Sequence, residues 1–150
     1  MHEALLFLHI LAATIWTGGH VVLATIVLPR VLKAADPEML LAFEGRFERI
    51  GIPALLVQVA TGIWMAVDLV PDVRLWFRPA EADPIAHLVL AKLVLLLATA
   101  ALALDAKLRV LPRLTADRLN DMALHIAAVT LLSIAFVFVG VSFRSGGLPW

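Results

Sequence analysis

Cysteine is absent from this chain of 150 residues, and charged residues are scarce. The lack of cysteine excludes disulfide bonds, iron–sulfur clusters and thiolate metal sites. Charged side chains make up 16% of the sequence, whereas soluble domains usually carry about 25%. The formal net charge is +0, so the chain has no basic footprint for nucleic acid. No hydrolytic triad, phosphate-binding loop or zinc motif is present either.

Long apolar runs dominate what is there. Hydrophobic residues make up 62% of the chain, and the mean hydropathy is +0.96. Four runs are long enough to cross a hydrocarbon layer of about 30 Å as helices. They cover approximately residues 3–28, 50–70, 84–110 and 119–142. The sequence therefore predicts an all-α integral membrane protein, a four-helix bundle that forms a single transmembrane domain over residues 1–150.

The segment before the second run has a different pattern. In residues 37–49, PEMLLAFEGRFER, apolar residues recur at helical spacing and charged residues lie between them. This pattern predicts a short amphipathic helix at the membrane interface. An ordinary solvated linker helix is the alternative.

The distribution of lysine and arginine predicts the orientation of the bundle. Eight basic residues fall on one side of the predicted spans: Arg30, Lys33, Arg46, Arg49, Lys107, Arg109, Arg113 and Arg118. Three fall on the other side: Arg74, Arg78 and Arg144. Because basic residues are enriched on the cytoplasmic side, both termini are expected outside.

Histidines inside the apolar runs are the strongest functional signal. His9 and His20 lie eleven residues apart on the first run, so both project from one helix face about 16 Å apart. Counting depth gives His9 a mate near the outer end, His87, and gives His20 a mate near the inner end, His125. Each pair lies on two different helices, which predicts bis-histidine ligation of one haem b or two. Hydrogen-bonded interhelical histidines are the alternative.

Three basic residues are candidates to bind the haem propionates. Lys92 lies about eight residues inside the third run, and its stem is expected to reach toward Asp68 or toward a propionate. Arg74 and Arg78 lie in the predicted outer loop, where a guanidinium matches a carboxylate in geometry. For the two arginines, solvation at the interface is the alternative.

Two further positions near His20 are candidate cofactor contacts. Trp16 lies deep in the first run, where it packs on a cofactor or fills the core. Gly19 either provides room for a porphyrin or permits close contact between helices. Both readings stay open from the sequence.

Several short motifs resemble known membrane families. They are His9-x6-Trp16-x-Gly18-Gly19, VLPR at 27–30, FERIGIPALLVQVATGIW at 47–64, AKLVLLL at 91–97 and DAKLRVLPRL at 105–114. Together they resemble the CopD-type copper-resistance membrane proteins and, more distantly, the HemJ-type protoporphyrinogen oxidases. The second resemblance implies that His9 ligates haem and that Lys92 matters for function. His20 departs from that family, which usually has an apolar residue there.

The expected function is that of a small haem b protein of the bacterial inner membrane. It would pass electrons between a membrane pool such as quinone and another redox protein; if it is an enzyme, it is a membrane oxidoreductase. Copper handling, haem-dependent protoporphyrinogen oxidation and a structural role in a larger complex are the alternatives. Copper(I) prefers Cys and Met, so only the four histidines would bind copper here. Membrane lipid and a second copy of the chain are the other expected partners.

Overall fold

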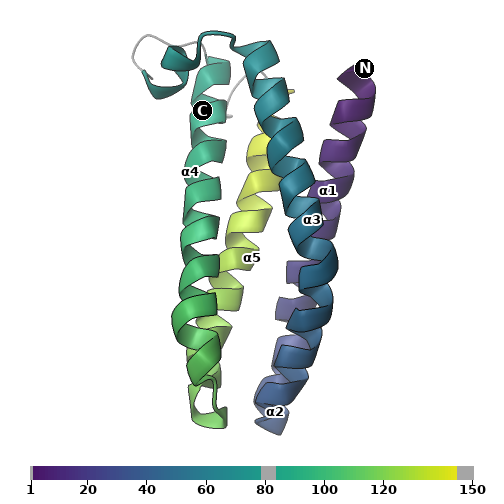
Figure 1. Ribbon diagram of the computed structural model, residues 1–150, viewed down its shortest axis with the longest axis vertical. Coiled ribbons are helices and arrows are strands. Elements are labelled where there is room, and N and C mark those ends of the chain that lie inside the picture. The colour runs from purple at the N-terminus through teal and green to yellow at the C-terminus, as the bar shows by residue number, and fades with distance from the viewer. Residues whose placement is uncertain (1, 79–83, 145–150) are drawn as a thin grey trace.

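The protein is a bundle of membrane-length helices (Figure 1). A computed structural model describes residues 2–78 and 84–144 of the chain. Within these ranges four helical runs are long and apolar enough to span a membrane: His2–Ala34, Pro37–Leu69, Pro84–Arg113 and Ala116–Ser142. The described residues contain no strand. The predicted all-α bundle with four spans is confirmed.

The first span continues past the proline that was expected to end it. It consists of α1 (His2–Val22), the π-helical turn η1 (Leu23–Val27) and α2 (Leu28–Ala34). In the π turn the N–H of Leu28 bonds to the carbonyl of Leu23, so Pro29 falls in the first turn of α2, where a missing N–H is tolerated. The helix ends instead at Ala35, which has a left-handed φ of 50°. The predicted boundary near residue 28 is therefore too early.

The second span is a single helix, α3 (Pro37–Leu69). The Asp36 carboxylate caps its start by accepting hydrogen bonds from the backbone N–H groups of Glu38 and Met39, at 3.0 and 3.3 Å. Residues 37–49 are thus the first turns of α3 and not a separate interfacial helix. Their apolar face packs inside the bundle, where Leu40 is fully buried.

The remaining elements complete the bundle. They are the 3-10 turn η2 (Val73–Phe77), α4 (Pro84–Asp105), the π turn η4 (Ala106–Val110), the 3-10 turns η5 (Leu111–Arg113) and η6 (Ala116–Arg118), and α5 (Leu119–Ser142). Trp76 in η2 is buried, and its Nε1–H donates to the carbonyl of Val70 at 2.9 Å. This bond ties the turn to the end of α3.

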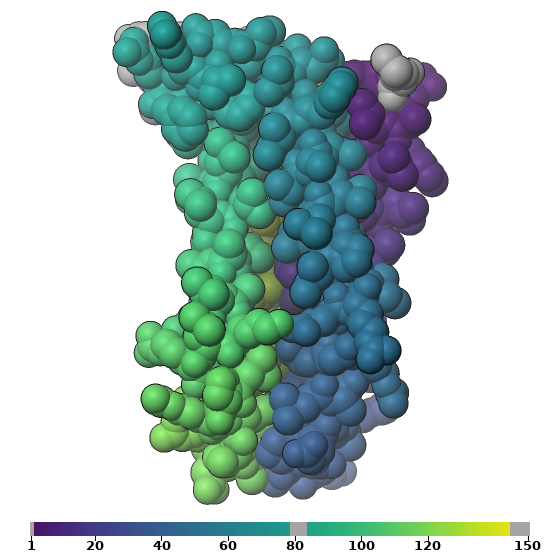
Figure 2. Space-filling model, in the orientation of Figure 1, coloured from purple at the N-terminus to yellow at the C-terminus, as the bar shows by residue number. Residues whose placement is uncertain are grey.

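The second and third spans, α3 and α4, follow each other in the sequence but do not pack side by side. α1 packs along α3 and α5, and α4 packs along α5, whereas α3 and α4 are not packed along each other. Figure 2 shows the surface hollowed between these two helices at mid-height, and atoms of α5 are visible behind them. The start of α1 and the end of α5 lie at the same end of the bundle (Figure 1). We name this the outer end and the opposite end, which holds α2 and η4, the inner end.

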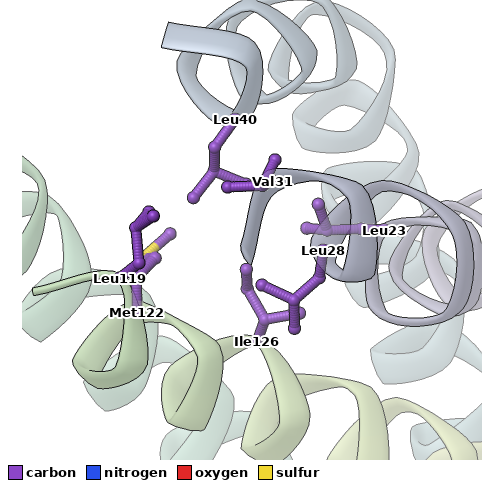
Figure 3. Close-up of a cluster of buried hydrophobic side chains, with 7 residues drawn as sticks. All are labelled: Leu23, Leu28, Val31, Leu40, Leu119, Met122 and Ile126. Atoms are coloured by element: carbon purple, nitrogen blue, oxygen red, sulfur yellow. The ribbon is translucent and has the colours of Figure 1, made fainter. Parts of the chain in front are cut away.

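Two apolar clusters close the ends of the bundle. The inner cluster joins the first span, α3 and α5, and contains Leu23, Leu28, Val31, Leu40, Leu119, Met122 and Ile126 (Figure 3). The outer cluster contains Val70, Trp76, Ala86 and Val89. The interior between the two clusters is where the polar side chains lie.

Candidate functional site

Buried polar side chains gather in the middle of the bundle. Apart from Ser142 near the end of α5, the buried polar side chains of the described residues are His9 and His20 on α1, Gln58 and Thr61 on α3, Thr99 on α4, and Thr130 and Ser133 on α5. A polar group in an apolar membrane interior is costly unless it has a partner. We therefore define this central layer as the candidate site.

His9 is held by a hydrogen bond across the interface between α1 and α3. Its Nδ1 lies 2.9 Å from Oγ1 of Thr61, and the Thr61 hydroxyl donates to the carbonyl of Val57 at 2.6 Å. The same hydroxyl also lies 3.2 Å from the Gln58 carbonyl. Since both carbonyls can only accept, its proton is directed to them, and in that arrangement the proton between His9 and Thr61 belongs to Nδ1. Nε2 then carries the free lone pair, which is the state that binds a metal. No described residue forms a hydrogen bond with this Nε2.

The surroundings of His9 are narrow and include an unpaired oxygen. A Cβ on Gly62 would lie 3.1 Å from Cε1 of His9, so only glycine fits there without displacing the imidazole. Oε1 of Gln58, one turn away on α3, is buried and has no hydrogen-bond partner among the described residues. An unpaired buried acceptor is uncommon and calls for a ligand or ordered water.

His20 presents the same tautomer by a local bond. Its Nδ1 lies 2.8 Å from the carbonyl oxygen of Trp16, which can only accept, so Nδ1 carries the proton. The ring lies 4.5 Å from the Trp16 ring and 5.3 Å from the Phe47 ring, measured between centroids. Nε2 again has no hydrogen bond to a described residue. His9 and His20 are both buried, each 9% exposed, with a nitrogen lone pair available.

Gly19 makes room for a side chain of the protein. A Cβ at this position would overlap the Phe47 ring, whereas a Cβ on Gly18 would meet nothing within 4 Å. Of the two readings that the sequence left open, the structure favours close contact between α1 and α3 at Gly19. Trp16 is buried beside the same ring, and its Nε1 has no hydrogen-bond partner among the described residues.

Lys92 lies on α4 and points toward the outer part of α5. Its ammonium lies 5.4 Å from the centroid of the Phe143 ring and 3.5 Å from the place of a Cβ on Gly140. Asp68, one of its two predicted partners, instead lies 3.4 Å from His2. Within residues 2–78 and 84–144, no carboxylate forms an ion pair with Lys92. A cation at this depth without an ion pair to a described carboxylate can accept an anionic ligand.

The predicted mates of the two histidines lie in other surroundings. His87 is exposed in the first turn of α4, whereas His9 is buried against α3. His125 lies 2.8 Å from Oδ2 of Asp105 through Nε2 and 3.0 Å from the carbonyl of Asp121 through Nδ1. Both of its ring nitrogens are therefore already engaged.

The two arginines predicted to bind propionates lie away from the central layer. Arg74 and Arg78 are exposed at η2, at the outer end. The backbone N–H of Arg74 bonds to the Asp72 carboxylate at 3.0 Å. Neither side chain reaches the interior of the bundle.

Sequence reasoning missed the residues of α3 that complete the site. Thr61 holds His9, Phe47 packs on His20, and Gln58 carries the unpaired oxygen. A signal was present, because VQVATG at 57–62 places an amide, a hydroxyl and a glycine three and four residues apart inside an apolar run. Residues at this spacing share one helix face.

Comparison with known proteins identifies a family. The family model described as copper resistance protein D matches residues 41–143. That stretch includes Thr61, His87, Lys92 and His125 but begins after His9 and His20. No curated protein and no solved structure matches the chain. The similarity to the HemJ-type oxidases stays a prediction.

Proposed function

The chain belongs to the copper resistance protein D family and is a multi-pass membrane protein, and we propose that it binds haem b inside its helical bundle with His9 as an iron ligand. The observation that carries the proposal is the hydrogen bond from His9 Nδ1 to Thr61. It fixes the imidazole with its Nε2 lone pair available in a buried interior. Histidine held in this way is a common axial ligand of haem iron.

The set of available donors fits haem better than a bare copper ion. A protein copper site needs several donors close together, and the described residues contain no group of three or more His, Cys, Asp or Glu side chains that could hold a metal. A porphyrin supplies four nitrogens itself, so the protein needs to add only one or two. The buried histidines stand singly, which is sufficient for haem.

Basic residues toward the outer end would stabilise the propionates. Lys92 has an aromatic neighbour and no ion pair with a described carboxylate. We assign it to a propionate, with Arg74 and Arg78 as further propionate contacts at the outer end. A lysine without its own carboxylate would otherwise be costly in the membrane.

His20 is the candidate ligand of a second haem. Its tautomer is fixed by the Trp16 carbonyl, and its Nε2 is available as in His9. Because the two rings lie about 16 Å apart along α1, they cannot share one iron. His87 and His125 remain the proposed opposing ligands, and His125 would first have to leave Asp105.

Bound haem would supply one-electron redox chemistry. The residues of the chain hold the ligand nitrogen, balance charge and exclude water with the two apolar clusters. We propose a membrane quinone pool or another redox protein as the electron partner, which would make the chain a membrane oxidoreductase if it turns over a substrate.

Haem content of purified variants tests this assignment. The His9→Ala variant is expected to lose the haem that His9 ligates in the wild type. The control His2→Ala, which changes an exposed histidine, should keep the wild-type haem content. His20→Ala should halve the content of a two-haem protein and leave that of a one-haem protein unchanged. Wild-type haem content in His9→Ala would overturn the proposal, and so would copper bound in a fixed ratio to a protein without porphyrin.

A further inference from the structure

A second polar site lies at the inner end, apart from the central layer. A pocket of about 250 Å³ opens between the end of α4 and the start of α5. Its polar lining consists of Arg109, Arg113, Arg118, Asp105, Asp121 and His125. The family name and the proposed haem site assign no role to this pocket.

The charges of the pocket leave two arginines available. Asp105 is occupied on both oxygens, by Arg109 at 3.0 Å and by His125 at 2.8 Å. Arg113 and Arg118 form no ion pair with any described residue. Asp121 also lines the pocket and forms no ion pair with a described residue, so the lining has three arginines against two aspartates, an excess of one positive charge. Guanidinium groups match the geometry of phosphate oxygens.

The start of α5 adds to the positive potential. The N-cap residue of this helix, Arg118, provides no side-chain hydrogen bond to the first turn. The N-terminus of a helix carries a partial positive charge, which Asp121 in the first turn of α5 offsets in part. The remaining charge adds to that of Arg113 and Arg118.

One exposed leucine lines the pocket, and two more lie next to pocket residues in the sequence. Leu124 lines the pocket itself and is 71% exposed. Leu104 and Leu108 are also exposed, and they precede Asp105 and Arg109 by one residue. A phosphate held by the arginines would thus have apolar surface next to it. Free phosphate has no apolar part that could contact that surface, whereas the acyl chains of a phospholipid would pack on it.

From this arrangement we propose that the pocket binds the headgroup of an anionic phospholipid from the inner leaflet. Arg113 and Arg118 contact the phosphate, and the acyl chains lie along Leu108 and Leu124. The position of the pocket agrees with this occupant, since it lies at the end of the bundle that carries the eight basic residues. The site is independent of haem, so either proposal can fail alone.

Native mass spectrometry of the full chain, in mixed micelles of phosphatidylglycerol and phosphatidylcholine, tests the proposal. The wild-type protein should retain phosphatidylglycerol in preference to phosphatidylcholine. The double variant Arg113→Gln/Arg118→Gln should retain at least about 10-fold less phosphatidylglycerol than the wild type. The matched control Arg46→Gln/Arg49→Gln removes the same charge from exposed residues of α3 at the same end, and it should stay near the wild type.

Three results would overturn the proposal. They are equal losses in the two double variants, an unchanged Arg113→Gln/Arg118→Gln protein, and displacement of the lipid by inorganic phosphate at equal concentration, which would indicate a site for the free anion. If the glutamine variant does not fold, Arg113→Lys/Arg118→Lys replaces it. That variant keeps the charge and loses the guanidinium geometry. It should retain less phosphatidylglycerol than the wild type does, but more than the amount of phosphatidylcholine that the wild type retains. Full wild-type retention would contradict phosphate recognition by the two guanidinium groups.

Discussion

A single hydroxyl decides which nitrogen of His9 is available to a metal. Thr61 gives its proton to the Val57 carbonyl and accepts the Nδ1 proton of His9. Without this acceptor the imidazole could rotate or take the other tautomer. Partners of this kind commonly change metal affinity by about 10- to 100-fold.

Replacement of Thr61 by valine tests this role. Thr61→Val keeps the shape and removes the acceptor, so we expect about 10- to 100-fold weaker haem binding, while Thr61→Ser should restore it. Haem titration followed by absorbance measures the effect.

Thr99→Val is the matched control for this change. Thr99 is equally buried, but its hydroxyl bonds only to the Leu95 carbonyl of its own helix. An equal loss of haem affinity in the two valine variants would show that Thr61 does not act through His9.

At this scale the sequence predicted the histidines better than their partners. His9 and His20 stand out because an ionisable side chain is rare in an apolar helix. Their contacts depend on how α1 is rotated against α3, which residue counting does not give. Depth alone pairs His125 with His20, and it does not reveal that the His125 imidazole lies 2.8 Å from Asp105 of the neighbouring helix.

Among the elements, the contact between α1 and α3 determines the geometry of the central layer. The Phe47 ring lies over Gly19 and against the His20 ring. Since small residues allow the helices of a membrane protein to approach closely, Gly19 sets the spacing at which Thr61 can meet His9.

A methyl group at Gly19 should push the two helices apart. Gly19→Ala places a Cβ inside the Phe47 ring, and overpacking of this kind costs about 1–3 kcal/mol. The loss is measured by unfolding in mixed detergent, followed by circular dichroism.

Gly18→Ala serves as the control, because its Cβ meets nothing within 4 Å. This variant should be as stable as the wild type or slightly more stable, since alanine favours a helix over glycine. Equal stability of the two alanine variants would contradict the packing described for α1 and α3.

Helix existence was predictable from hydropathy, but helix ends were less so. The sequence VLPR occurs at 27–30 and again at 110–113, and in both places a π turn precedes the proline. The π turn lets the first span continue where proline alone predicts an end. Residues 37–49 carry an amphipathic pattern, yet they continue into the second span as one helix, α3, which also passes through Pro53. An amphipathic pattern therefore shows which face of a segment is apolar, but it does not show where the helix ends.

The interior of the whole molecule is apolar toward both ends and polar in the middle. The inner and outer clusters close the bundle, and the spans α3 and α4 stay apart between them. A bundle that only had to be stable in lipid would have no need of buried histidines, an unpaired glutamine oxygen and an intramembrane lysine in this layer. The proposed haem would give each of these features a role.

The visible absorption spectrum of the purified protein, with iron and copper measured on the same sample, tests the central claim most directly. A haem b protein gives a Soret band and a sharp α band in the reduced-minus-oxidised difference, with iron bound and no copper in a fixed ratio. A colourless protein, or one that binds copper without porphyrin, would contradict the account.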